Sequence, residues 1–144
     1  MVRVCEVPKE NPNTKEIEEI LRNSKVIAVI GVSRNPEKDS HRVAKYLMEK
    51  GYEVIPVNPN AKEILGKKCY PRLEDVKERI DIVDVFRPAE EVPEIVEMAK
   101  KKGAKVIWMQ LGIVNNQAAE KARKMGMKVV MNRCMMVEHK RLLE

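Results

Sequence analysis

Five short apolar segments, separated by stretches with helical periodicity, constrain the fold of this 144-residue chain more than any other feature. The apolar segments lie at 26–30, 54–57, 82–86, 106–109 and 128–131. The first reads Val-Ile-Ala-Val-Ile, a continuous apolar run of the kind found in strands buried on both faces of a parallel sheet. Strands and helices that alternate along a chain predict a doubly wound parallel sheet of about five strands, with helices on both faces. We therefore expect a Rossmann-like α/β fold.

The helices between these strands are predicted by apolar residues at three- and four-residue spacing. A first helix has an apolar face formed by Ile17, Ile20 and Leu21, and Asn13 or Thr14 is expected to cap it. Glycines that follow the next helices supply natural stop signals. The later helices are expected at 39–50, around 92–99, around 118–125 and at 135–143.

Some details of the topology are less directly encoded. We expect the strand order 3-2-1-4-5, with strands numbered along the chain. Because Pro56 cannot donate to a sheet ladder, regular pairing of the second strand is expected to end there. Residues 61–73 are expected to form a short helical turn and an irregular connector around Gly66. The chain is predicted to form a single domain over 25–144, on which residues 1–24 pack as an N-terminal segment and helix.

Charge composition narrows the class of partner. The net charge of +6 raises nucleic acid as a candidate partner, but acidic residues are interleaved with the basic ones and only 3% of residues are aromatic. We therefore expect solvated helix faces and no nucleic-acid binding. The modest positive excess also suits a ligand rich in phosphates. Abundant Lys and Glu with little Gln hint at a thermophile, although nine methionines argue the other way.

The cysteines and the apolar runs predict the compartment. Cys5, Cys69 and Cys134 are widely spaced and odd in number, so neither a disulfide framework nor a zinc site is expected. Residues 1–9 lack the apolar core of a signal peptide, and no apolar run approaches the roughly 20 residues of a membrane span. These features predict a cytoplasmic protein without a membrane partner.

The carboxyl ends of the strands are where a doubly wound sheet binds its ligand. After the first strand, Gly31 lets backbone approach a ligand closely, Ser33 and Ser40 supply hydroxyls, and Arg34 supplies a bidentate fork. Together with free amides at the next helix start, these groups suit a pyrophosphate. A single glycine is not the Gly-x-Gly-x-x-Gly fingerprint. The alternative is a capped turn with Arg34 in solvent.

The end of the second strand discriminates between nucleotides. NAD-binding domains place a carboxylate there for the ribose hydroxyl. Here the segment 57–62 reads Val-Asn-Pro-Asn-Ala-Lys, with a lysine and no acid. This composition favours NADP or the 3′-phospho-ADP of coenzyme A (CoA). The alternative for Lys62 is an ordinary exposed lysine.

Several blocks of the sequence, in one order, resemble a known family. They read A-V-I-G-V-S-R-N-P, S-H-R-V-A-K-Y-L, G-Y-E-V-I-P-V-N-P-N, V-D-V-F-R-P, W-M-Q-L-G and V-V-M-N-R-C-M-M-V-E-H. The chain is similar over residues 25–139 to the stand-alone CoA-binding-domain proteins. These proteins resemble the N-terminal CoA-binding domain of the succinyl-CoA synthetase α subunit.

The resemblance implies that CoA lies across the strand ends. It implies that Gly31, Ser33 and Arg34 hold the diphosphate, and that Asn58, Pro59 and Lys62 face the adenosine and its 3′-phosphate. It also implies that Phe86, Arg87 and Pro88 border the pantetheine arm, and that Gln110 and Gly112 lie near the far end of that arm. Arg87 could instead bond carboxylates in a structural network. With their loop neighbours, the candidate CoA-binding residues are Gly31, Val32, Ser33, Arg34, Asn35, Pro36, Ser40, Asn58, Pro59, Asn60, Lys62, Phe86, Arg87, Pro88, Gln110, Gly112 and Cys134.

No catalytic or metal-binding constellation is apparent in the sequence. His139 is expected on a helix face, and His41 near a helix start could contact backbone or phosphate. The resemblance implies that the synthetase's phosphorylated histidine lies outside this domain. Cys134 follows the fifth strand, where a mixed disulfide with CoA is conceivable, although a small buried hydrophobic role is favoured.

These observations predict a protein that binds CoA or acyl-CoA and is not an enzyme. It would act as a carrier, a sensor or a partner module, either as a homodimer or with a partner enzyme subunit. The alternative is an NADP-dependent oxidoreductase or another nucleotide-binding Rossmann protein.

Overall fold

The computed structural model describes residues 6–144, so Cys5 and the start of the predicted N-terminal segment lie outside the described residues. Five parallel strands form the central sheet in the order β2-β1-β5-β6-β7. The strands are β1 (Val26–Ile30), β2 (Glu53–Val57), β5 (Ile82–Val85), β6 (Val106–Met109) and β7 (Lys128–Val130). The predicted Rossmann-like α/β fold is confirmed.

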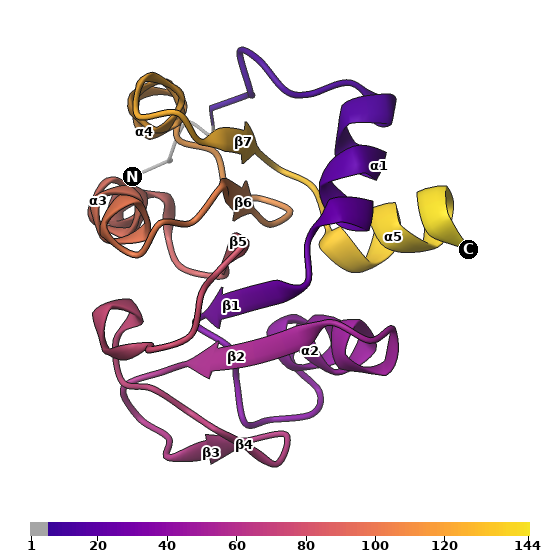
Figure 1. Ribbon diagram of the computed structural model, residues 1–144, viewed down its shortest axis with the longest axis vertical. Helices are drawn as coiled ribbons and strands as arrows, with labels where there is room; N and C mark the ends of the chain where they lie inside the picture. Colours follow the sequence, from indigo (N-terminus) through magenta and orange to yellow (C-terminus); the bar gives the residue numbers. More distant parts are fainter. Residues whose placement is uncertain (1–5) are drawn as a thin grey trace, which may run out of the picture.

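Five α-helices cover both faces of the sheet, as predicted. Helices α1, α2 and α5 lie on one face, and α3 and α4 lie on the other (Figure 1). Their bounds are α1 (Thr14–Asn23), α2 (Asp39–Glu49), α3 (Val92–Lys101), α4 (Asn116–Lys124) and α5 (Met135–Leu143). None of the helices formed by residues 6–144 has the length and apolar character needed to cross a membrane.

Local signals explain where the first helix begins and how it packs. Asn13 caps α1 through a reciprocal capping box with Glu16, in which each side chain bonds the other residue's backbone N–H. The face formed by Ile17, Ile20 and Leu21 is buried, and α1 packs against α5 (Figure 1). The N-cap prediction for this helix is therefore confirmed.

The predicted strand order 3-2-1-4-5 is wrong. Strand β5, third in this parallel sheet, adds beside β1 on the side away from β2, which gives the order 2-1-3-4-5. Pro56 supplies a physical reason: its carbonyl accepts from Tyr70 N (3.0 Å) on the outer side of β2, so its missing N–H also faces outward. An inner position for β2 would leave a neighbouring strand without that donor.

Two details around β2 also differ from expectation. Regular pairing with β1 continues through Pro56 to Val57. The missing N–H of the proline faces the outer edge, so the hydrogen bonds between β1 and β2 lose no donor. The connector contains a hairpin, β3 (Glu63–Ile64) and β4 (Lys67–Lys68), in place of the expected helical turn. Leu65 and Gly66 both adopt positive φ (55° and 74°), as a two-residue type I′ turn requires. Leucine is an uncommon residue for that turn, which is why the sequence did not indicate it.

Two short 3₁₀ turns complete the chain, η1 (Leu73–Asp75) after the hairpin and η2 (Ala89–Glu91) before α3. Asn11, which precedes α1, covers the outer edge of the sheet at Met131, the residue that follows β7. Asn11 donates to Met131 O and accepts from Met131 N, both at 2.8 Å, so its amide imitates a neighbouring strand. At Met131, this contact prevents another strand from pairing with the edge of the sheet that lies farthest from β2.

Candidate functional site

The winding of the sheet reverses between β1 and β5. The carboxyl ends of these two strands meet at Gly31. Gly31 has φ +88°, and a Cβ on it would lie 2.8 Å from Phe86 O and 2.8 Å from Arg87 Cδ. Gly31 N donates to Val57 O (2.9 Å), which links this exit to β2 as well. A side chain does not fit, so glycine is required here for both conformation and space. Ligands of open α/β sheets bind at this reversal.

The loop that follows β1 presents two hydroxyl groups beside the start of α2. Ser40 Oγ accepts from Ser33 N (2.9 Å), and Ser33 Oγ accepts from Asn35 N (3.0 Å). His41 Nδ1 lies 2.8 Å from Ser33 O, so the backbone contact is present, which is one of the two contacts considered for this histidine. Among residues 6–144, neither serine hydroxyl donates a hydrogen bond. Ser33 is half-buried and Ser40 is buried, so the Ser33 hydroxyl is the more accessible donor for an anion.

The other predicted residues of this loop differ in their availability. Arg34 is exposed and has no ion-pair or hydrogen-bond partner among the described residues. Asn35 and Pro36 are exposed beside it. Val32, in contrast, is fully buried in the core, and its carbonyl accepts from Asn58 Nδ2 (2.8 Å). Val32 therefore ties the first loop to the second, and its side chain cannot reach a ligand.

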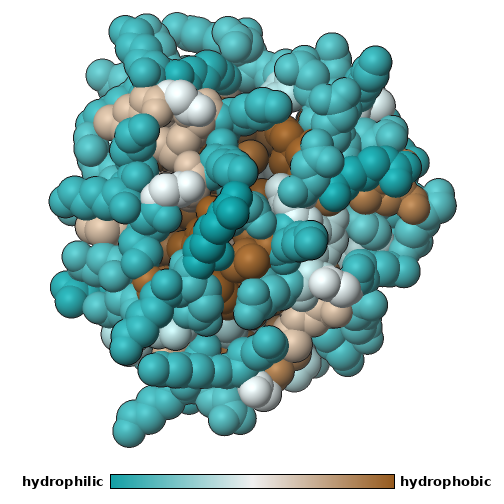
Figure 2. Space-filling view, in the orientation of Figure 1, coloured by the Kyte–Doolittle hydropathy of each residue, from teal (hydrophilic) through white to brown (hydrophobic). Residues whose placement is uncertain are grey.

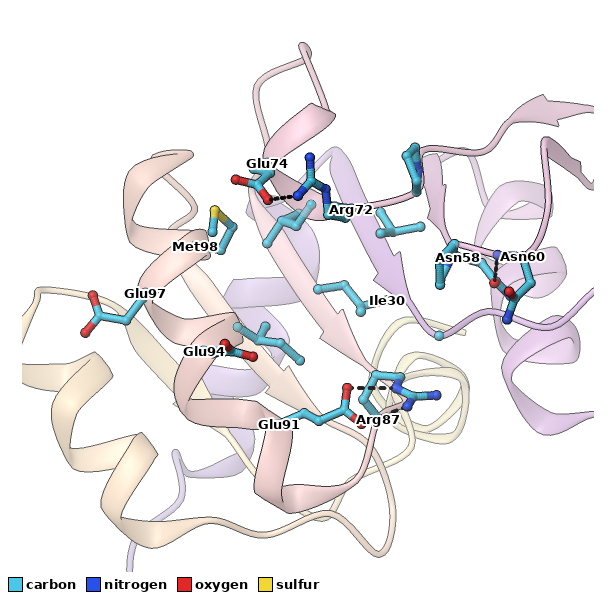
Figure 3. A pocket seen from close by; sticks show the side chains of 16 residues that line it. Ile30, Asn58, Asn60, Arg72, Glu74, Arg87, Glu91, Glu94, Glu97 and Met98 are labelled. Atoms are coloured by element: carbon cyan, nitrogen blue, oxygen red, sulfur yellow. Dashed lines mark hydrogen bonds and ion pairs between the residues drawn. The ribbon is translucent and has the colours of Figure 1, made fainter.

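A cavity of about 600 Å³ opens beside Gly31, between the ends of β1 and β2, the connector before η1, and α3 (Figure 3). Five of the predicted site residues line it: Gly31, Asn58, Pro59, Asn60 and Arg87. The sequence analysis missed the remaining lining residues, which are Ile30, Val57, Pro71, Arg72, Leu73, Glu74, Glu91, Glu94, Ile95, Glu97 and Met98. Most of these come from α3 and from the connector after β2, where the sequence analysis expected a helical turn in place of the hairpin. The outward-facing acids of α3 belong to no recognisable motif.

The cavity combines apolar walls with a charged rim. Ile30, Leu73 and Ile95 belong to it, and hydrophobic side chains show between hydrophilic ones on this face of the molecule (Figure 2). Four glutamates and two arginines supply the charges. Arg72 Nη1 lies 3.1 Å from Glu74 Oε1. Because carboxylates outnumber guanidinium groups, the phosphates of a ligand would be better placed toward the loop after β1.

Arg87 lies on this rim and bonds a carboxylate, as the alternative for this residue proposed. Its Nε and Nη2 donate to Glu91 Oε1 and Oε2, at 3.1 and 2.7 Å (Figure 3). The bonds from Arg87 hold the pKa of Glu91 below its ordinary value. Arg87 therefore both lines the cavity and belongs to an ion pair.

The remaining predicted residues lie outside this cavity. Phe86 is half-buried, whereas Pro88 and Gly112 are exposed, and Lys62 is exposed where the hairpin begins. Gly112 N donates to Asn132 Oδ1 (2.7 Å). Cys134 is half-buried at the N-cap of α5. The structure thus does not gather all 17 predicted residues around one cavity.

Gln110 is buried, and it bonds protein groups from two elements. Its Nε2 donates to Asp84 Oδ1 (2.5 Å), and its Oε1 accepts from Met135 N (3.3 Å) at the start of α5. Asp84 is fully buried in β5, and its Oδ2 has no hydrogen-bond partner among residues 6–144. Burial raises the pKa of Asp84 to about 7. Sequence analysis missed Asp84, although an acid inside an apolar strand was a visible signal.

The histidines occupy separate places. His139 is buried in α5, where its Nδ1 lies 2.8 Å from Tyr46 OH, and burial lowers the pKa of this histidine. Its predicted helical position is confirmed. Among residues 6–144, no group of three His, Cys, Asp or Glu side chains is arranged to hold a metal ion.

Comparison with known proteins agrees with this architecture. The Bacillus subtilis protein YneT is 43% identical over 130 residues, which are 90% of this chain and 96% of YneT. A solved structure, a hypothetical protein from Pyrococcus horikoshii OT3, has a TM-score of 0.91 and 46% identity, with all of both chains covered.

A longer relative is an enzyme. The ADP-forming acetate–CoA ligase II of Archaeoglobus fulgidus is 39% identical over 83 residues, which are 56% of this chain but 12% of the enzyme. The sequence profile of the CoA binding domain family matches residues 25–140. The resemblance seen in the sequence is thereby confirmed, and the chain belongs to the CoA binding domain family.

Proposed function

We propose that this chain binds coenzyme A or an acyl-CoA, and that it acts as a non-catalytic carrier, sensor or partner module. Membership of the CoA binding domain family is the observation that carries the proposal. The hydroxyls of Ser33 and Ser40 support it, together with Arg34, which has no ion-pair or hydrogen-bond partner among residues 6–144, because these groups suit a diphosphate.

The second loop supports the choice of nucleotide. No carboxylate stands at the end of β2, and the exposed Lys62 is available to neutralise a phosphate on the ribose. The apolar walls of the neighbouring cavity suit the uncharged adenosine. NADP is the second candidate, since Lys62 could also meet its 2′-phosphate.

Calorimetric titration with CoA, dephospho-CoA and NADPH tests this proposal. Arg34→Ala should weaken CoA binding by about 1–3 kcal/mol, the scale of a charge-assisted contact. Lys62→Ala should weaken CoA more than dephospho-CoA, which lacks the 3′-phosphate. Lys128→Ala is a matched control, because this exposed lysine begins β7 at the opposite edge of the sheet. Tight NADPH binding without CoA binding would refute the proposal.

The non-catalytic part of the proposal needs its own experiment. Native mass spectrometry of the purified protein should show bound CoA or acyl-CoA. Incubation with acetyl-CoA should then give no protein-dependent release of free thiol. Release that disappears in Cys134→Ser would show instead that this half-buried thiol at the start of α5 acts catalytically.

A further inference from the structure

Arg87 and Glu91 form an ion pair near Gly31, the residue that opens the loop where the diphosphate of CoA is expected. The Cδ atom of Arg87 lies over Gly31, at the distance that excludes a side chain there. Its side chain therefore lies beside the exit of β1, where the loop expected to hold the diphosphate begins. Arg87 and Glu91 both line the 600 Å³ cavity, and their side chains are 46% and 43% exposed.

Because of the geometry of the pair, an anionic ligand would compete with Glu91 for the guanidinium of Arg87. Two donors of the guanidinium are engaged by the two carboxylate oxygens of Glu91. A phosphate presents the same forked set of oxygens to a guanidinium as a carboxylate does. Since the pair is exposed, it is weak enough for a ligand to replace, because such pairs are worth about 1 kcal/mol or less.

We infer that Arg87 exchanges Glu91 for the diphosphate when CoA binds, so that Glu91 sets the affinity for CoA. This inference rests on the proposed function. It moves Arg87 from the border of the pantetheine arm to the diphosphate. It also assigns Glu91 a role as an internal competitor, a carboxylate that occupies the guanidinium until a ligand phosphate replaces it.

Glu91→Gln tests this competition, with Glu94→Gln as the matched control. Both changes remove one negative charge from α3's end of the same cavity, but Glu94 has no ion-pair or hydrogen-bond partner among residues 6–144. By calorimetry, Glu91→Gln should tighten CoA binding about two- to fivefold, the range expected for release from an exposed pair. Glu94→Gln should change it less.

A double-variant cycle separates competition from general electrostatics. Arg87→Ala should weaken CoA binding about tenfold or more. In that background, Glu91→Gln should no longer tighten binding, because the competitor has nothing to occupy. Equal effects of Glu91→Gln and Glu94→Gln, or tightening that persists without Arg87, would overturn the inference alone. A wild-type protein that does not bind CoA would overturn the proposed function as well.

Discussion

Asp84→Asn should remove a pH dependence from the stability of the fold. Asp84 is fully buried in the central strand β5, its Oδ2 has no hydrogen-bond partner among residues 6–144, and burial raises its pKa from 3.8 to about 7. Between these two values the folded protein holds a proton that the unfolded chain has lost. The free energy of unfolding therefore falls as pH rises through this window, and the loss is complete above about pH 7.

The magnitude follows from the difference between the two pKa values. Each pKa unit corresponds to about 1.36 kcal/mol, so the full loss is roughly 4 kcal/mol for a pKa that moves from 3.8 to about 7. Asparagine keeps the oxygen that accepts from Gln110 but cannot ionise. Its new N–H₂ group lacks an acceptor, which costs about 1–3 kcal/mol at every pH. The variant should therefore be less stable than the wild type near pH 5 and gain on it toward pH 8.

Chemical denaturation followed by far-UV circular dichroism measures both proteins across this range, and the buried Trp108, the single tryptophan of the chain, gives a second probe. The difference in unfolding free energy should change by roughly 2–3 kcal/mol between about pH 5 and 7. Groups with lowered pKa values, such as Asp81, titrate in both proteins and cancel in the difference. If the unfolding free energies of the wild type and Asp84→Asn change with pH in parallel, the reasoning is refuted.

Three further variants test the frame around the site. Gly31→Ala should destabilise the fold by about 2 kcal/mol or more in chemical denaturation, because its Cβ would meet the Phe86 carbonyl at positive φ; unchanged stability would show that the two exits can separate. Asn13→Ala should cost about 1 kcal/mol through loss of the capping box of α1, and the same loss should be absent in Asn60→Ala, because the exposed Asn60 side chain has no hydrogen-bond partner among residues 6–144. Tyr46→Phe should cost about 1 kcal/mol by removing the hydroxyl that bonds His139, and a neutral result would mean that solvent replaces this bond.

The alternating pattern predicted the architecture well because burial leaves little choice. The run at Val26–Ile30 has three fully buried central residues between β2 and β5, as an internal parallel strand requires. The strand order was not fixed by this pattern, since a strand can add to either side of β1 and be equally buried. Pro56 holds the missing information, because a proline inside a strand can mark the end of regular pairing, as expected from the sequence, or the outer edge of a sheet, as the structure has it.

The site was only partly predictable because its walls come from segments with no local signal. Loops that follow strands are recognisable, so Gly31, Asn58 and Arg87 were found. The cavity also uses Arg72 from the connector, and its position depends on the hairpin before it. The Arg87–Glu91 pair is a local contact four residues apart, yet its importance comes from Gly31, which is distant in sequence.

The strand order also bears on the size of the ligand that the proposal invokes. The cavity lies on the face of α3, whereas the loop of Ser33 and the start of α2 belong to the opposite face. A ligand that used both would have to cross the sheet end beside Gly31, where Phe86 O and Arg87 Cδ already occupy the space that a side chain would need. A molecule with adenosine at one end, a diphosphate in the middle and a long arm has groups that suit both faces. The crossing at Gly31 therefore favours CoA or a dinucleotide over a smaller phosphate ligand, and the titrations with CoA and NADPH separate those two.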